Sequence, residues 1–210
     1  EYYEKLGYRV VLTDLINNIN VKDIFKLTDN VMINLNEKRR SKGLKPRKVR
    51  ALIIGVPNVG KSTLINRLVS KKATKVGNKP GITKSLEWIR VNDKLELLDT
   101  PGILWPRLDE GNVAYNLASM TAIKEEVLDV QDIAIYIINR MIDWYPSHLA
   151  ERYGVTSDDE LIDILDKIGK KRGAISGGEA HYDRVYTIVL RDLRDGYLGK
   201  VTFDRVEDVI

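Results

Sequence analysis

The stretch Gly55–Ser62 reads GVPNVGKS and fits the phosphate-loop template G-x-x-x-x-G-K-[S/T]. Gly55 and Gly60 allow a tight turn that aims backbone N–H groups at phosphate oxygens. Lys61 supplies a point charge for the β- and γ-phosphates, and the hydroxyl of Ser62 can bind Mg²⁺. The pattern therefore predicts a nucleotide held by Pro57, Asn58, Val59, Gly60, Lys61, Ser62 and Thr63.

A second motif, DTPG at Asp99–Gly102, follows the apolar run LELL. In phosphate-loop NTPases an aspartate at this place reaches Mg²⁺, usually through water, and Gly102 can offer its backbone N–H to the γ-phosphate. Thr83 lies between the motifs, where a threonine can close over Mg²⁺ when the γ-phosphate is present. This order indicates a GTPase-type switch. We predict Lys61 and Thr83 as catalytic residues, and as metal ligands Ser62, Thr83 and Asp99.

The segments around these motifs read as the elements that a phosphate loop needs. Residues 49–56 form an apolar run typical of a buried parallel strand, and residues 62–70 have helical spacing. Residues 86–91 and 95–100 predict a hairpin around NDK. Upstream, residues 8–14 look like a strand, and residues 20–43 like a helix that Asn20 caps and Gly43 ends.

A base reader is the remaining requirement of a GTPase. Guanine is usually read by N-K-x-D, and the best downstream candidate is Asn139, Arg140 and Asp143. Its spacing is one residue too long, and Arg stands where Lys is usual. Since Ile133, Ile137 and Met141 recur at a helical period, the sequence favours a buried helix here over a degenerate base reader.

Composition sets wider limits. The 210 residues, 43% of them hydrophobic, are enough for an α/β domain and a smaller second domain. Cysteine is absent, which excludes a disulfide framework and a thiolate metal site. No apolar run approaches the roughly 20 residues that span a bilayer, and we expect a cytoplasmic monomer without a membrane partner. The net charge of +4 permits a nucleic-acid partner.

The chain resembles the ribosome biogenesis GTPase A family, the YlqF-like GTPases. The resemblance is carried by KPRKVRALIIGVPNVGKSTLINRL, KPGITKS, ELLDTPGILWP and residues 132–203. In that family the G domain is circularly permuted, with N-K-x-D ahead of the phosphate loop. The resemblance therefore implies an N-K-x-D upstream of Glu1 and a base-backing loop near residues 13–18. Residues 1–112 would be the C-terminal portion of an α/β G domain, followed by an all-helical RNA- and ribosome-binding domain at 113–210.

The resemblance also implies a function: Mg²⁺-dependent GTP hydrolysis as a switch in assembly of the large ribosomal subunit, with binding to rRNA. Ile103 follows DxxG, where many GTPases carry a water-orienting glutamine, so we expect slow hydrolysis that the ribosome stimulates. Asn58 either helps to bind K⁺ or is a turn asparagine. Two other functions stay open: a phosphate-loop NTPase without guanine preference, and a non-catalytic RNA-binding fragment.

The C-terminal half reads as helices. Residues 157–173 open with Ser157 and Glu160, a capping box, and Gly177–Gly178 is a turn. A set of basic residues could meet RNA phosphates, namely Lys170, Lys171, Arg172, Arg184, Arg191 and Arg194. Asp183, Asp192 and Asp195 lie beside these arginines, so a solvated surface is the alternative. Here the residues alone favour the solvated surface, and the family resemblance favours RNA.

Overall fold

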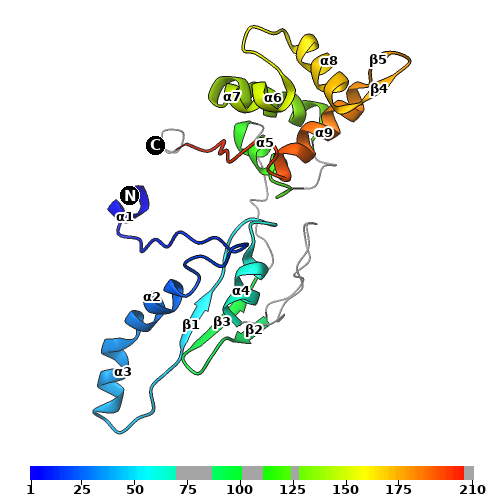
Figure 1. Cartoon of the computed structure of the whole chain (residues 1–210). Coiled ribbons are helices and arrows are strands. Elements are labelled where there is room, and N and C mark those ends of the chain that lie inside the picture. Colours follow the sequence, from blue (N-terminus) through cyan, green and yellow to red (C-terminus); the bar gives the residue numbers. More distant parts are fainter. Residues whose placement is uncertain (70–86, 101–110, 124–127, 206–210) are drawn as a thin grey trace. The chain divides into compact units, whose positions relative to one another are not determined.

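The computed structural model describes residues 1–69, 87–100, 111–123 and 128–205 (Figure 1). The chain divides into two compact units, Glu1–Pro106 and Arg107–Ile210. Each unit is built around its own hydrophobic core. The predicted α/β fold, with a helical region after it, is confirmed.

The first unit contains a three-stranded sheet of order β1-β3-β2 and a helix packed on it (Figure 1). Its elements are α1 (Tyr2–Lys5), α2 (Asp23–Val31), α3 (Ile33–Arg40), β1 (Val49–Leu52), α4 (Lys61–Val69), β2 (Glu87–Arg90) and β3 (Leu95–Asp99). The core joins Ile65 and Leu68 of α4 to Leu95 and Leu97 of β3. The predicted hairpin is confirmed, because β2 and β3 pair antiparallel.

The parallel pairing of β1 with β3 decides where the two sequence motifs meet. Leu52 lies opposite Leu98 in this pair. The phosphate loop follows β1, and Asp99 is the last residue of β3. Because the carboxyl ends of parallel strands share one edge of a sheet, both motifs lie at that edge.

Two predictions about the N-terminal segment are wrong. Residues 8–14 form no strand, and Leu12 is 81% exposed, because no strand in the described part of the chain pairs with this segment. The helix predicted over residues 20–43 is broken at Met32 into α2 and α3. Asn20 has a left-handed backbone (φ 57°) and does not cap α2, which begins after Lys22. Gly43 does end the helical stretch, with φ 69°.

The second unit is mostly helical. Its elements are α5 (Asn112–Ser119), α6 (Val130–Trp144), α7 (Pro146–Tyr153), α8 (Leu161–Arg172), β4 (Ile175–Ser176), β5 (Glu179–Ala180) and α9 (Tyr182–Arg194). Its core includes Ile137 and Met141 from α6 with Val185 and Val189 from α9, all fully buried. Within the described ranges, no helix of either unit is long and apolar enough to cross a membrane.

Of two local predictions for the second unit, one is wrong and one is confirmed. The capping box is wrong: α8 begins at Leu161, its N-cap is Glu160, and no side-chain bond caps it. The turn at Gly177–Gly178 is confirmed and joins the short strands β4 and β5. Its glycines have φ of 62° and 93°, which a residue with a Cβ rarely adopts.

Candidate nucleotide site

The phosphate loop runs from the end of β1 to the start of α4 (Figure 1). Gly60 has φ 99°, and the nearest atom to a Cβ added there is Leu15 Cδ1, at 3.5 Å. Glycine is therefore required at this position for its backbone conformation rather than for lack of space. Asn58 has φ 59°, which asparagine adopts more readily than most residues, and this favours the turn interpretation.

Lys61, the first residue of α4, folds back over the loop that precedes it. Its Nζ donates to the carbonyl oxygens of Gly55 at 2.9 Å and Val56 at 2.8 Å. Partial burial lowers the pKa of Lys61, and the charge of Asp99 offsets only part of this lowering. The ammonium thus lies at the loop and within the electrostatic reach of the second motif.

The remaining predicted residues of the loop follow from this geometry. Pro57 is buried, whereas Val59 is exposed. Ser62 and Thr63 lie in the first turn of α4, where backbone N–H groups have no intrahelical partner. A helix start of this kind is suited to an anion.

The end of β3 is tied directly to the end of β1. Asp99 and Thr100 are buried, and Thr100 Oγ1 donates to the carbonyl oxygen of Ile53 at 2.6 Å. This bond holds Asp99 beside the phosphate loop, so Thr100 acts as a positioning residue. The sequence analysis did not single it out, although a threonine after a strand-ending aspartate was the available signal.

A turn over residues 14–19 also lies against the phosphate loop. Asp14 Oδ1 accepts from the backbone N–H of Ile16 and Asn17, at 2.9 and 3.0 Å. Arg67 Nη2 of α4 donates to the Ile16 carbonyl at 3.2 Å, and Leu15 approaches Gly60. The structure therefore brings the segment near residues 13–18 next to the loop. Thr83, Gly102 and Ile103 lie outside the described residues.

The buried-helix interpretation of residues 133–143 is confirmed. Ile133, Ile137 and Met141 are buried along α6. Arg140 Nε donates to the Tyr136 hydroxyl at 3.1 Å, and its guanidinium lies 4.6 Å from the centre of the Trp144 ring. Arg140 therefore supports packing within the second unit, and Asn139, Arg140 and Asp143 all lie on α6.

The predicted RNA-contacting residues divide into two groups. Arg194 Nη2 donates to the Ala118 carbonyl at 3.1 Å, and Arg172 Nη2 lies 3.3 Å from Asp192 Oδ1. These two guanidinium groups are engaged inside the second unit. The other four side chains are exposed: Lys170, Lys171, Arg184 and Arg191.

Comparison with known proteins identifies the family. The model of a family described as 50S ribosome-binding GTPase matches residues 50–175. Ribosome biogenesis GTPase A of Bacillus licheniformis is 39% identical over 211 residues, which cover 100% of this chain and 75% of that protein. The chain belongs to the ribosome biogenesis GTPase A family. A more distant relative, the probable ribosome biogenesis GTPase A of Mycoplasma genitalium, is 34% identical over 87% of this chain and 66% of its own.

Solved structures of this family support the fold. A structure described as GNP-bound YlqF from T. maritima has a TM-score of 0.52 and 25% identity, over 80% of this chain and 72% of that one. The GDP-bound structure of TM YlqF has a TM-score of 0.55 and 24% identity, over 82% and 75%. As a member of the ribosome biogenesis GTPase A family, this chain is a GTP-binding phosphate-loop GTPase.

Ser62→Ala is expected to weaken GTP binding about tenfold in the presence of Mg²⁺, because one polar contact of about 1–2 kcal/mol is lost. With Mg²⁺ chelated, the variant and the unaltered protein should bind alike. Titration calorimetry with and without a chelator measures both values. Ser41→Ala, which removes an exposed hydroxyl of the same unit, is the control. An equal loss in both conditions would contradict the Mg²⁺ role of Ser62.

Proposed function

We propose that this chain is a GTP-hydrolysing switch in assembly of the large ribosomal subunit and that it binds the rRNA of that subunit. It acts as a cytoplasmic monomer. The observation that carries this proposal is the meeting of the two motifs at one sheet edge, where the Thr100 bond to Ile53 fixes Asp99 beside the phosphate loop. Membership of the ribosome biogenesis GTPase A family supplies the biological setting.

The proposed site uses each residue for a separate part of the nucleotide. Backbone N–H groups over Pro57–Thr63 hold the phosphates, and Lys61 neutralises the β- and γ-phosphates. The proposed Mg²⁺ ligands are Ser62, Thr83 and Asp99. The backbone N–H of Gly102 contacts the γ-phosphate. The donor set fits Mg²⁺, which prefers hard oxygen ligands and retains several waters.

Hydrolysis requires a water oriented in line with the γ-phosphate. Ile103 has no hydrogen-bonding group for this task. Another group must therefore orient the water, and we place that group on the bound ribosome. Hydrolysis is then slow without ribosomes and faster with the large subunit.

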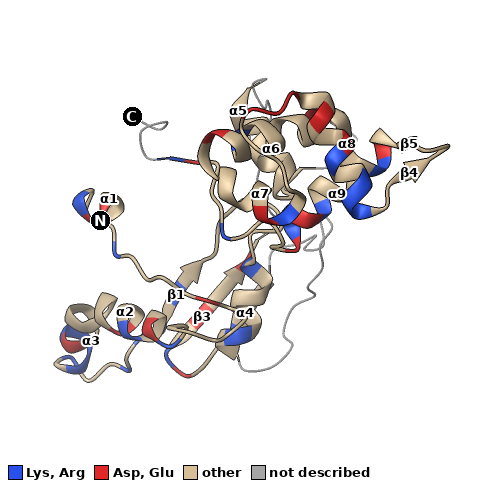
Figure 2. Ribbon diagram, turned by 45° about the horizontal axis from the view of Figure 1, so that its top comes forward, with Lys and Arg blue, Asp and Glu red and all other residues tan. Residues whose placement is uncertain are grey.

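The partner surface of the second unit is proposed at its exposed cations, Lys170, Lys171, Arg184 and Arg191. In Figure 2, blue marks the end of α8 and parts of α9. Contacts of this kind bind phosphates without reading sequence. Arg172 and Arg194 are left out because their guanidinium groups bind within the unit.

Arg184→Gln with Arg191→Gln is expected to weaken binding to the large subunit and to lower the salt slope of log K by about 2, since each lost phosphate contact lowers it by about 1. Stimulation of GTP hydrolysis by large subunits should fall in parallel, while hydrolysis without ribosomes stays unchanged. Repeating the hydrolysis assay with ATP in competition with GTP measures the preference for guanine. Lys200→Gln, an exposed cation of the same unit, is the control. If large subunits do not stimulate GTP hydrolysis by the unaltered protein, the ribosomal switch is refuted. If the salt slope of the double variant is unaltered, Arg184 and Arg191 belong to a solvated surface.

A further inference from the structure

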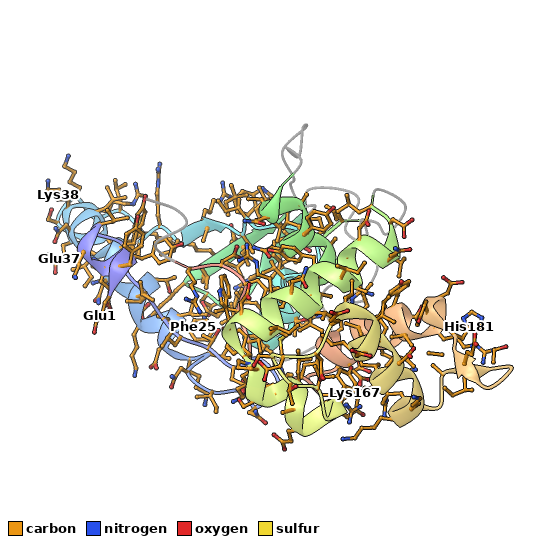
Figure 3. The ribbon with its side chains drawn as sticks, turned by 90° about the horizontal axis from the view of Figure 1, so that it is seen from above. Glu1, Phe25, Glu37, Lys38, Lys167 and His181 are labelled. Carbon is orange, nitrogen blue, oxygen red and sulfur yellow. The ribbon has the colours of Figure 1, made fainter. Side chains whose placement is uncertain are left out.

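A second strongly basic surface lies in the first unit, between α3 and β1. Residues 38–50 read KRRSKGLKPRKVR and contain no acidic residue. We call residues 38–47 the basic connector. Five of its cations are exposed, namely Lys38, Arg40, Lys42, Lys45 and Arg47. Figure 2 shows blue at the end of α3 and along the chain that leaves it, and Figure 3 shows Lys38 extending away from the ribbon.

The connector is held in one conformation by two side chains of α3. Asn36 Nδ2 donates to the Arg47 carbonyl at 3.1 Å, and Asn36 Oδ1 accepts from the Arg47 N–H at 2.8 Å. Arg39 Nε donates to the Lys45 carbonyl at 2.9 Å. These bonds involve the connector's backbone and leave the side chains of Lys45 and Arg47 outside. A surface ordered in advance loses little conformational entropy on binding.

Among the described residues, the cations next to the connector form ion pairs, and those of the connector do not. Lys48 Nζ lies 2.7 Å and Arg50 Nε 3.1 Å from the Glu96 carboxylate, which lowers the pKa of Glu96 through these hydrogen bonds. Lys94 lies 3.5 Å from Asp29. By contrast, in the described part of the chain no carboxylate forms an ion pair with the five exposed cations of the connector. Like charges gathered without counter-charges favour a polyanionic partner.

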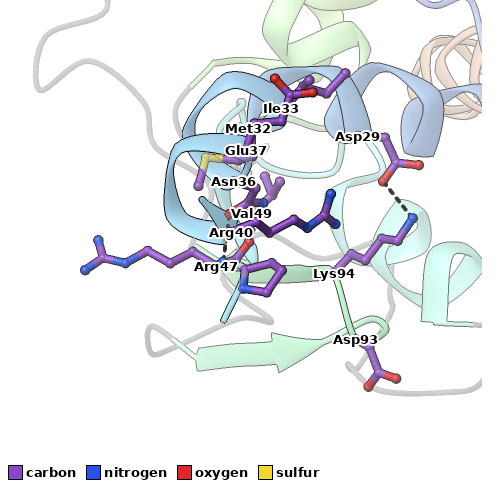
Figure 4. Close-up of a pocket in the computed structure, with 11 residues that line it drawn as sticks. Asp29, Met32, Ile33, Asn36, Glu37, Arg40, Arg47, Val49, Asp93 and Lys94 are labelled. Atoms are coloured by element: carbon purple, nitrogen blue, oxygen red, sulfur yellow. Dashed lines mark hydrogen bonds and ion pairs between the residues drawn. The ribbon is translucent and has the colours of Figure 1, made fainter. Parts of the chain in front are cut away.

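A pocket that includes Arg40, Pro46 and Arg47 of the connector in its lining is not purely basic. It has a volume of about 310 Å³, and its lining mixes the acidic residues Asp29, Glu37 and Asp93 with the basic residues Arg40, Arg47 and Lys94 (Figure 4). Arg47 extends away from the other labelled residues in the same view. A phosphate in the pocket would meet these carboxylates as well as cations, whereas Lys38, Lys42 and Lys45 do not line the pocket and are exposed. The outer surface of the connector is therefore the one suited to an extended phosphate backbone.

We infer that the basic connector is an RNA-binding surface that contacts phosphates, separate from the surface of the second unit. The choice of RNA among polyanions rests on the proposed function. Aromatic residues are absent from residues 38–50, so base stacking is not part of this contact. The surface contributes affinity and orientation, and it reads no sequence.

The test neutralises three connector cations in the full chain, by Lys42→Gln, Lys45→Gln and Arg47→Gln. The control neutralises three exposed lysines elsewhere in the first unit, by Lys5→Gln, Lys22→Gln and Lys26→Gln. Both variants lose the same charge. All six positions are exposed, and thermal unfolding is expected to be unchanged in both.

Binding to large-subunit rRNA and to an RNA duplex of about 20 base pairs is measured over a range of KCl concentrations. The connector variant should bind either RNA about 10- to 100-fold more weakly near 0.1 M salt, with a salt slope reduced by about 2–3. The control variant should keep the slope. Equal slopes for both variants would overturn the inference. It would also be overturned if the connector variant bound both RNAs normally and lost only its binding to vesicles containing phosphatidylglycerol. Because the duplex is not ribosomal, this comparison stands even if large subunits fail to stimulate GTP hydrolysis, a failure that would refute only the proposed function.

Discussion

Lys61→Ala is expected to weaken GTP binding by about two orders of magnitude or more. A hydrogen bond from a charged donor contributes about 1.5–3 kcal/mol, and the ammonium meets both the β- and the γ-phosphate. Its position supports this role, since Nζ lies 2.9 Å from the Gly55 carbonyl and 2.8 Å from the Val56 carbonyl within the loop. Titration calorimetry with GTP in excess Mg²⁺ measures the loss.

The matched control is Lys94→Ala, which removes a lysine from the same unit, paired with Asp29 at 3.5 Å. This variant is expected to bind GTP like the unaltered protein, because surface ion pairs contribute little to stability. Lys61→Ala should also abolish hydrolysis, with and without large subunits. Wild-type affinity in Lys61→Ala would show that the loop's N–H groups alone hold the phosphates.

The elements around the nucleotide site could be predicted because their signals are local. A short apolar run, two glycines and a lysine at fixed spacing require a strand, a turn and a helix start. The hairpin of β2 and β3 also depends on neighbouring residues, with Asn92 Oδ1 accepting from the backbone N–H of Lys94 and Leu95 at 2.8 and 2.9 Å. Local chemistry thus determines both motifs and the strand between them.

The errors fall where the outcome depends on distant residues. Residues 8–14 have the composition of a strand, but a strand needs a partner, and the described chain provides none for this segment. The capping box at Ser157 and Glu160 fits the local template. However, the Thr156 N–H is bound instead by Asp159, at 2.7 Å, and Asp159 also binds Lys167. Asp159 and Lys167 are eight residues apart, so this pair lies beyond the four-residue template of a capping box.

Asp192 shows the same limit most clearly. The sequence predicts Asp192 beside the arginines of α9 on a solvated surface, yet this residue is fully buried. Its spacing from Val185 and Val189 places it on the apolar face of the helix, and this was the signal that could have identified it. An acid on an apolar face requires buried partners, which come from other helices.

Asp192→Ala is expected to destabilise the second unit by about 3–5 kcal/mol, because it leaves partly buried cations without their counter-charge. Arg152 Nε lies 2.8 Å from Asp192 Oδ2, the Tyr153 hydroxyl donates to the same oxygen at 3.0 Å, and Arg172 Nη2 lies 3.3 Å from Oδ1. Burial, and then the charge of Asp192, raise the pKa of Tyr153 well above its usual range, so its hydroxyl stays a donor. Hydrogen exchange of the amides in α7, α8 and α9 measures the loss within this unit alone.

The control is Asp195→Ala, an exposed carboxylate at the end of the same helix, for which we expect a change within about 0.5 kcal/mol. GTP affinity should be unaltered in both variants, because the phosphate loop belongs to the first unit. A double variant, Asp192→Ala with Arg152→Ala, distinguishes the physical cause. If the cost comes from an uncompensated guanidinium, removal of Arg152 should make the double variant less destabilised than the sum of the single changes. Strict additivity would instead attribute the loss to packing, and the buried carboxylate would not be the element that holds α7, α8 and α9 together.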